Sequence, residues 1–359
     1  LGIISIAALF LFFASCDVND SDRRSDCPCN NADSIGVWKF LGLADERVTS
    51  IAIHPTKPNI ILAGTSSDFS AGIPGRLYMS FNCAKTWELK IESASYSFTD
   101  IQFNTNNPDI IFCVPYGIMC TTNGGVNWNK SENGLIINVD TRINKIELDP
   151  TNPKIIYAGA SGFFGGTLYK TTNGGIDWFN LYKSENETPG LLNGITSIRI
   201  DKSNTNVLYV GTADEGILVK SLDGGNSFFK TGQNKYGAIV HDILIDENNS
   251  SIIYIANDNF GFFRSINSGA SFETINIGIP DSILAVKLLK HNNSNEIYGL
   301  TTIGDSGWIM KTNTNMINWL RYGIEKQRVS YYYSDIKITA DMKYIYFGTT
   351  GGIFRIRLF

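Results

Sequence analysis

The sequence predicts an all-β fold, a single seven-bladed β-propeller with four-stranded antiparallel blades, and three observations lead to it. An eight-residue phrase that ends in an aromatic residue, 121–128, returns almost unchanged at 171–178 and in weaker form four more times. The copies recur about every 40–50 residues, a period typical of propellers. Each interval also holds short apolar runs separated by Gly, Pro and Asn, as expected for strands joined by tight turns.

The N-terminal residues are predicted to lie outside the propeller. Residues 1–13 are almost wholly apolar, but the run is too short to span a bilayer and is typical of an export signal. The string Ala14-Ser15-Cys16 resembles a bacterial lipobox. We therefore predict an export signal over 1–15, lipidation of Cys16, a flexible polar tether over 16–34 and the propeller over 35–359. The protein would then be a lipoprotein of the bacterial cell envelope; a plain secretory signal with an incidental cysteine is the alternative.

The unit at 143–178 shows the strand plan that the other units repeat. Its first strand, 143–148, has one apolar row, and a turn with two prolines follows it. The second strand, 154–159, is apolar on both faces, as expected for a strand enclosed between neighbouring sheets. A third strand at 167–170 leads into the repeated phrase, and Trp178 opens the fourth strand.

The seventh unit lacks its fourth strand, and the missing strand is predicted at the other end of the sequence. Three strands at 335–338, 344–348 and 352–356 are followed by no copy of the phrase. Residues 37–43 precede the first unit and carry Trp38, the residue type that opens a fourth strand. We expect this segment to pair beside Phe354, which closes the ring and removes the exposed sheet edges.

The repeated phrase is predicted to form a turn with a structural role. Its Asx side chain bonds backbone amides of the same turn, its glycines adopt positive φ, and its aromatic ring is buried beneath the turn. Thr314 replaces the Asx residue in the sixth copy, so that turn is expected to be looser. The Asx and aromatic residues of the copies are Asn82, Trp87, Asn123, Trp128, Asn173, Trp178, Asp223, Phe228, Asn267, Phe272 and Trp319.

The phrase Ser/Thr-x-Asx-x-Gly-x-x-Trp resembles the BNR, or Asp-box, repeat, and the resemblance covers about residues 35–359. Families that share this repeat include bacterial sialidases, xyloglucan-cleaving glycoside hydrolases, sortilin-type receptors and photosystem II assembly-factor-like proteins; the resemblance is closest to the last three. The resemblance implies a propeller fold but indicates almost nothing about activity. Sialidases carry an Arg-Ile-Pro phrase near their start, whereas here Arg355-Ile356 lies at the C-terminus and is followed by Arg357. Xyloglucan hydrolases place acid and base on two propellers, and this chain contains one.

Three acidic residues are the sharpest candidates for catalysis. Asp100, Asp242 and Asp335 each stand just before the apolar run of a first strand. Because first strands line the central channel of a propeller, these residues are expected to ring one of its mouths, where two carboxyls about 5–10 Å apart would suit glycoside hydrolysis. Capping of the strand starts is the alternative, and we favour it. The positions that correspond in the other units are Ser50, Lys145, Ser197 and Ala285.

Cysteine use and net charge narrow the range of functions. Cys113 and Cys120 flank a predicted hairpin turn. The sequence allows two alternatives for them, a cross-strand disulfide or two packed free thiols. Cys27 and Cys29 have no second pair at ligand spacing, so no zinc, other metal or cofactor is expected, and one of the two is a candidate partner for Cys83. The net charge is −4, so the sequence gives no sign of the positively charged surface that nucleic-acid binding requires, and no nucleic-acid partner is expected.

Together these features favour a non-catalytic propeller, monomeric and held to the membrane only by its lipid. It would bind a protein or glycan partner through one face, as an interaction or assembly scaffold. The alternative is a carbohydrate hydrolase of the BNR type that acts on glucan or sialoside substrates with some of Asp100, Asp242 and Asp335.

Overall fold

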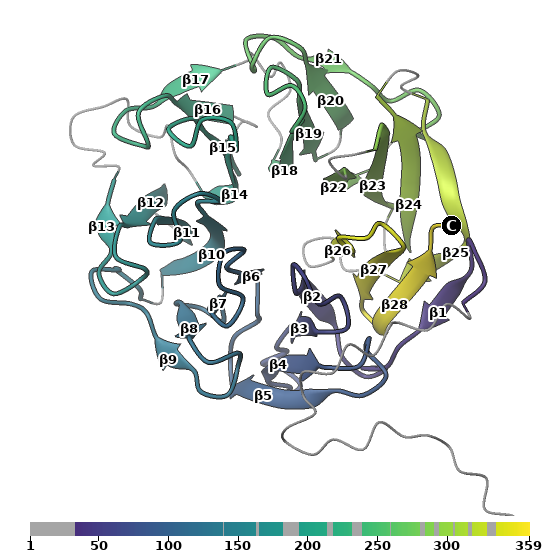
Figure 1. The fold of residues 1–359 in the computed structure, drawn as a ribbon, viewed down its shortest axis with the longest axis horizontal. Helices are drawn as coiled ribbons and strands as arrows, with labels where there is room; N and C mark the ends of the chain where they lie inside the picture. The colour runs from purple at the N-terminus through teal and green to yellow at the C-terminus, as the bar shows by residue number, and fades with distance from the viewer. Residues whose placement is uncertain are drawn as a thin grey trace, which may run out of the picture.

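A computed structural model describes residues 33–138, 140–162, 165–181, 194–213, 218–231, 239–258, 260–280, 284–290, 294–303, 306–314, 318–328 and 335–359. Within these residues the chain forms seven antiparallel sheets of four strands each. Figure 1 shows the sheets arranged as blades around a central axis, with the first strand of each blade innermost. The prediction of a seven-bladed β-propeller is confirmed.

The strands of each blade, from the axis outward, have the following bounds. Blades 1 to 3 consist of β2 (Val48–Ile53), β3 (Ile61–Thr65), β4 (Gly75–Ser80) and β5 (Glu88–Ser93); β6 (Ile101–Phe103), β7 (Ile111–Cys113), β8 (Met119–Thr121) and β9 (Asn129–Lys130); and β10 (Thr141–Leu148), β11 (Ile156–Gly162), β12 (Gly165–Thr171) and β13 (Phe179–Asn180). Blades 4 and 5 consist of β14 (Ile195–Ile200), β15 (Leu208–Thr212), β16 (Leu218–Ser221) and β17 (Phe229–Thr231); and β18 (Val240–Ile245), β19 (Ile253–Asn257), β20 (Gly261–Ser265) and β21 (Glu273–Thr274). Blades 6 and 7 consist of β22 (Leu284–Lys290), β23 (Glu296–Ile303), β24 (Ser306–Asn313) and β25 (Leu320–Arg328); and β26 (Ile336–Ile338), β27 (Tyr344–Thr349), β28 (Gly352–Arg357) and β1 (Trp38–Phe40).

The ring is closed by the N-terminal strand, as the sequence predicts. Strand β1 pairs antiparallel with β28, in the register Trp38 to Ile356 and Phe40 to Phe354. The described residues include two of the predicted tether, 33 and 34. Asp33 is already buried in blade 7, where its carboxylate bonds Arg355 Nε at 2.9 Å.

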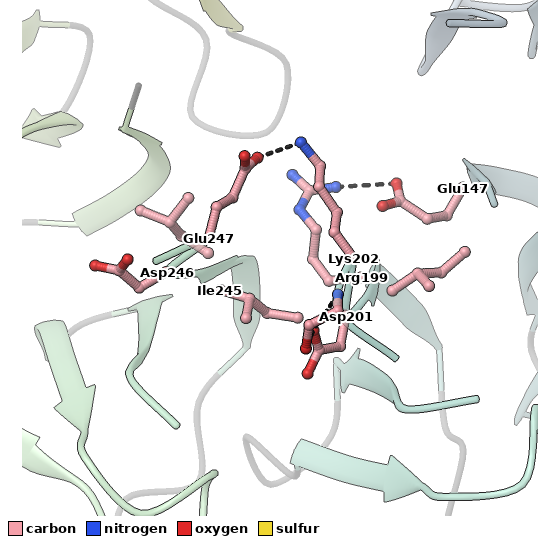
Figure 2. A pocket seen from close by; sticks show the side chains of 10 residues that line it. Glu147, Arg199, Asp201, Lys202, Ile245, Asp246 and Glu247 are labelled. Atoms are coloured by element: carbon pink, nitrogen blue, oxygen red, sulfur yellow. Dashed lines mark hydrogen bonds and ion pairs between the residues drawn. The ribbon is translucent and has the colours of Figure 1, made fainter. Parts of the chain in front are cut away.

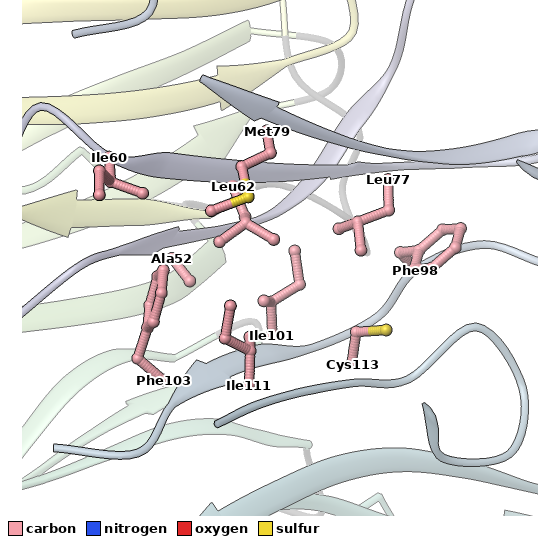
Figure 3. Packing of buried hydrophobic residues seen from close by; sticks show 10 residues of the cluster. All are labelled: Ala52, Ile60, Leu62, Leu77, Met79, Phe98, Ile101, Phe103, Ile111 and Cys113. Atoms are coloured by element: carbon pink, nitrogen blue, oxygen red, sulfur yellow. The ribbon is translucent and has the colours of Figure 1, made fainter. Parts of the chain in front are cut away.

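The hydrophobic core lies between neighbouring blades, since each sheet buries both of its faces against the next. The second strands show this best: every residue of β3, β15 and β19 is buried. Figure 3 shows one such layer, where Leu62 and Leu77 of blade 1 meet Ile101 and Ile111 of blade 2. Full burial of a side chain of this size contributes roughly 1.5–3 kcal/mol, so the seven layers supply most of the stability.

The Cys113–Cys120 disulfide is not formed, and both thiols are free. The register explains why: Cys113 pairs with Met119 and Phe112 pairs with Cys120. Adjacent residues of a strand point to opposite faces, so the two thiols lie on opposite sides of the sheet. Cys83 is disulfide-bonded.

The predicted export signal, the lipidation site Cys16, the cysteines Cys27 and Cys29 and most of the predicted tether lie outside the described residues. Among the residues that are described, no helix has the length and hydropathy needed to cross a bilayer.

Candidate functional site

A β-bulge recurs in the innermost strands and decides which side chains face the axis. The register shifts between Val48 and Ser50 in β2 and at the matching place in β10, β14, β18 and β22. The residue after the shift is Asp242 in β18 and Lys287 in β22. The prediction that Ala285 occupies this position in the sixth unit is therefore wrong by two residues, because periodicity alone does not locate a bulge.

The second strands carry glycine where the bulge comes closest. A Cβ added to Gly64 or to Gly211 would lie 2.4 Å from the hydroxyl oxygen of Ser50 or Ser197, respectively. No side chain fits at that distance, which accounts for the glycine that ends the apolar run of these second strands.

The structure uses the three candidate aspartates to join blades. Each accepts a hydrogen bond from a backbone N–H of the next blade's innermost strand, next to the bulge. The bonds run from Ile146 N to Asp100 Oδ2 at 3.1 Å, from Leu288 N to Asp242 Oδ2 at 3.1 Å and from Ile51 N to Asp335 Oδ2 at 3.0 Å. The geometry thus agrees with a capping role for the three aspartates, but the backbone N–H that each one caps belongs to the next blade.

Basic side chains, most of them from neighbouring blades, form ion pairs with Asp242 and Asp335. Lys287 Nζ lies 3.8 Å from Asp242 Oδ1 and 3.7 Å from Asp335 Oδ1. Arg199 Nη2 donates to Asp242 Oδ1 at 2.9 Å, and Lys337 Nζ lies 3.5 Å from Asp335 Oδ2. The two carboxylate oxygens bridged by Lys287 are therefore less than about 8 Å apart, a bound compatible with the separations of about 5–10 Å used in glycoside hydrolysis.

Burial and charge make this pair unsuited to acid–base work. Asp242 and Asp335 are only 1% and 7% exposed, so they do not face an open cleft. Burial alone would raise the pKa of Asp242, but Lys287 and Arg199 hold it below its ordinary value. At Asp335 burial would likewise raise the pKa, but nearby Lys337 and Lys287 outweigh it, so the pKa is also below its ordinary value. A general acid needs a raised pKa, so neither residue is suited to be the proton donor that glycoside hydrolysis requires.

Eight ionisable side chains gather near the axis, and we call them the axial charge cluster. They are Asp100, Glu147, Asp242 and Asp335 with Lys145, Arg199, Lys287 and Lys337. Their formal charges balance, which reduces the cost of placing them in a confined space. Burial lowers the pKa of Lys145 in spite of nearby Asp100, and burial raises the pKa of Glu147 in spite of Arg199. The basic members were not predicted as partners of the aspartates from the sequence. Lys145 and Lys287 occupy the position directly after the bulge, and Arg199 and Lys337 lie two residues beyond the position that corresponds to it.

A pocket of about 210 Å³ opens beside this cluster, where β14 and β18 end. It is lined by Glu147, Arg199, Ile200, Asp201, Lys202, Ser203, Leu244, Ile245, Asp246 and Glu247. Figure 2 shows two ion pairs side by side, one between Lys202 and Glu247 and one between Arg199 and Glu147. The pocket joins blade 4 to blade 5, and Arg199 connects it to Asp242 of the cluster.

The repeated phrase forms the same turn in five blades. In blade 2, Asn127 N donates to Asn123 Oδ1 at 2.9 Å and Gly125 N donates to Thr121 Oγ1 at 3.1 Å. Equivalent bonds occur at Asn82, Asn173, Asp223 and Asn267. In the sixth copy, within the part of the chain that is described, the buried Thr312 Oγ1 has no hydrogen-bond partner, as expected from Thr314 in the Asx position. We call these five turns the box turns.

Side chains of neighbouring blades also donate hydrogen bonds to the box turns, a contact that was not predicted from the sequence. In blade 3, Tyr157 Oη and Lys170 Nζ both donate to Gly224 O of the next box turn, at 3.0 and 2.9 Å. Tyr209 and Lys220 hold Ser268 O in the same way. The sequence signal was a Tyr in the second strand and a Lys in the third strand, which the units of blades 3, 4 and 6 share.

The box turns lie on the same face of the ring as the pocket. Gly224 N of the blade 4 box turn donates to Asn206 O, in the turn between β14 and β15 that follows the pocket residues. We call this side the box face. Large exposed side chains on its box turns are Val126, Ile176, Leu222 and Ile266. Within the described residues, no group of three or more His, Cys, Asp and Glu is placed to hold a metal.

Comparison with known proteins shows the fold and leaves the activity open. Neither a protein-family model nor a curated protein matches the chain. An ancestral GH74 enzyme is similar with a TM-score of 0.56 and 20% identity over 70% of this chain, which spans 34% of that enzyme. YCF48 bound to D1 peptide is similar with a TM-score of 0.64 and 12% identity, over 92% of this chain and 97% of that chain. Sqt1 of Chaetomium thermophilum, bound to the N-terminus of ribosomal protein L10, has a TM-score of 0.60 and 12% identity, over 89% and 98%.

Proposed function

We propose that this protein is a non-catalytic propeller that binds a protein partner through its box face. The observation that carries the proposal is the use of Asp100, Asp242 and Asp335 by the fold: each caps a neighbouring blade, and two of them form ion pairs with Lys287. Carboxylates with this role are not available as acid, base or nucleophile.

Two further features support a partner on the box face. The pocket and four exposed aliphatic side chains share that face, on a scaffold held rigid by the bonds between blades. Two of the similar structures, YCF48 with D1 peptide and Sqt1 with the N-terminus of L10, hold a peptide segment. We also propose that the box turns are BNR-type repeats, on the strength of their shared hydrogen-bond pattern.

The test is affinity capture from the native envelope with the full chain as bait. Ile176→Asp and Leu222→Asp change exposed positions of the box face, and Phe69→Asp changes an exposed position of the opposite face. We expect one protein to be recovered in a stoichiometric amount by the wild type and by Phe69→Asp, and to be lost with the box-face variants. Recovery that is unaffected by the box-face changes would exclude this face.

A carbohydrate hydrolase is the second candidate, and one observation favours it. Burial raises the pKa of Glu147, as a general acid requires, and Glu247 lies in the same pocket (Figure 2). Against it, a pocket of about 210 Å³ is smaller than the usual 300–1,000 Å³ of small-molecule sites. Hydrolysis of a glucan or sialoside by the wild type, with loss of activity in Glu147→Gln, would establish the enzyme in place of the binder.

We further propose that the protein is exported and anchored by lipid on Cys16, on the basis of the apolar run and small residues before it. Expression with radiolabelled palmitate in a bacterial host tests this. Label and membrane association should be lost in Cys16→Ala and retained in Cys120→Ala. Equal labelling of both variants would argue against the anchor.

A further inference from the structure

The pocket between β14 and β18 carries an excess of negative charge. Four carboxylates line it, from Glu147, Asp201, Asp246 and Glu247, against the two cations of Arg199 and Lys202. Lys290 Nζ pairs with Asp246 Oδ2 at 2.7 Å and neutralises that carboxylate from outside the pocket. One negative charge is still in excess after Lys290 is counted, so the pocket favours a cationic guest.

Arg199 is poorly available to an anionic guest, because each of its three nitrogens already donates a hydrogen bond within the protein. Its Nε donates to Ile243 O at 2.8 Å, its Nη1 to Glu147 Oε2 at 3.2 Å and its Nη2 to Asp242 Oδ1 at 2.9 Å. Removing any of these bonds would take a donor from a buried or half-buried carboxylate or carbonyl. An anion would therefore have to break an existing network, whereas a cation would not.

Lys202 occupies the position in the pocket where a cationic guest would bind. Its ammonium pairs with Glu247, and its side chain is 57% exposed, while that of Glu247 is 27% exposed. A lysine with this exposure loses little when it leaves a surface ion pair for water. A cation that entered from outside would take over Glu247, and it would also benefit Glu147, whose pKa is raised by burial even with Arg199 beside it.

We propose that this pocket receives the side chain of a lysine or arginine from the protein partner, and that Lys202 is the resident cation which this side chain displaces. This inference rests on the proposed protein-binding function and names the chemistry that the partner presents. The volume of about 210 Å³ suits a single long side chain better than an oligosaccharide or a folded element. Leu244, Ile245 and Ile200 supply the apolar surface along which the methylene groups of such a side chain pack.

The experiment is an NMR titration of the 15N-labelled protein with two neutral-capped amides that differ only in charge. Nα-acetyl-lysine methylamide is the probe, and Nα-acetyl-norleucine methylamide is its uncharged counterpart. We expect the lysine amide to shift the resonances of residues 199–203 and 244–247. Its dissociation constant should be at least tenfold lower than that of norleucine amide. Lys202→Met should tighten its binding several-fold, because the competing resident cation is gone. Glu247→Gln should weaken it about tenfold, which corresponds to about 1.4 kcal/mol.

A matched pair elsewhere on the surface provides the control. Lys130 Nζ lies 3.3 Å from Glu132 Oε2, far along the chain from the pocket, with the lysine side chain exposed. Lys130→Met and Glu132→Gln should leave the titration unchanged. Equal binding of both amides, binding of Nα-acetyl-aspartate methylamide instead, or no effect of Lys202→Met would each overturn the inference.

The two proposals fail in different ways. If envelope capture recovers a box-face partner but Glu247→Gln and the lysine amide have no effect on it, the pocket inference is wrong and the binding function stands. If the lysine amide binds as expected but no partner is recovered, the pocket chemistry is supported and the protein-binding function loses its basis.

Discussion

Replacing Asp33 with Asn tests how much of the stability depends on ring closure. Asp33 accepts hydrogen bonds from Arg355 through Nε, at 2.9 Å, and through Nη2, and Lys39 Nζ lies 2.8 Å from its other oxygen. The side chains of Asp33 and Arg355 are only 4% and 3% exposed. Arg355 also stacks on Tyr344, 4.4 Å from the ring centroid. Removing the carboxylate leaves a guanidinium buried without its counter-charge.

Breaking a buried ion pair by removing one partner costs about 3–5 kcal/mol. We expect the lower end of this range, about 3 kcal/mol, because Asn still accepts one hydrogen bond from Arg355 and Lys39 can turn to water. Against a typical total of about 5–15 kcal/mol, that is a large fraction of the stability. The change should therefore be evident in a simple unfolding experiment.

The assay is urea unfolding followed by tryptophan fluorescence at pH 7, combined with hydrogen exchange of β1 and β28. Asp341→Asn is the control, since Asp341 pairs with Lys343 at 3.6 Å in an exposed position. The control should lose less than about 1 kcal/mol. A double-mutant cycle with Arg355→Met measures the coupling directly. A loss below about 1 kcal/mol in Asp33→Asn, with unchanged exchange in β1, would refute the role assigned to this pair.

Three further predictions follow from burial and charge. Trp319→Ala should cost about 3–5 kcal/mol in unfolding free energy, because Trp319 is 1% exposed and stacks on a neighbouring ring; a smaller loss by urea unfolding would contradict its place in the core. The lowered pKa values of Asp242 and Asp335 mean that their stabilisation is present above the ordinary value of 3.8 and is lost as pH falls through the lower folded values; thermal melting should thus change little from pH 7 to about pH 5 and drop below about pH 4. Burial raises the thiol pKa of both Cys113 and Cys120, so iodoacetamide at pH 7 should label the fully buried Cys113 only after unfolding and the half-buried Cys120 earlier; fast labelling of native Cys113 would contradict the register.

The number of blades and the closing strand could be predicted from the sequence because both follow from patterns that repeat. The apolar runs return with each unit, and the strand that carries Trp38 has the composition of the piece that blade 7 lacks. Local turn chemistry was equally readable, since Asn123 and its counterparts bond amides within four residues.

Features that depend on the exact register of a strand, to within one or two residues, could not be predicted. The bulge in β22 brings Lys287, and not Ala285, to the axis, and the hairpin register sends Cys113 and Cys120 to opposite faces. In a strand, a displacement of one residue reverses every side chain, yet it leaves the apolar pattern almost intact. Lys287 and Arg199 reach the aspartates from other blades, so no local pattern contains these ion pairs.

The pairing of β1 with β28 has a consequence for synthesis and assembly. Asp33 and Arg355 are 322 positions apart in the sequence, so the first strand has no partner until the last one has been made. Until then the growing molecule holds an unpaired β-edge, which can accept the equivalent strand of another copy. Two molecules delayed at this stage could exchange their first strands and leave as an intertwined dimer, each ring locked by its neighbour's N-terminus.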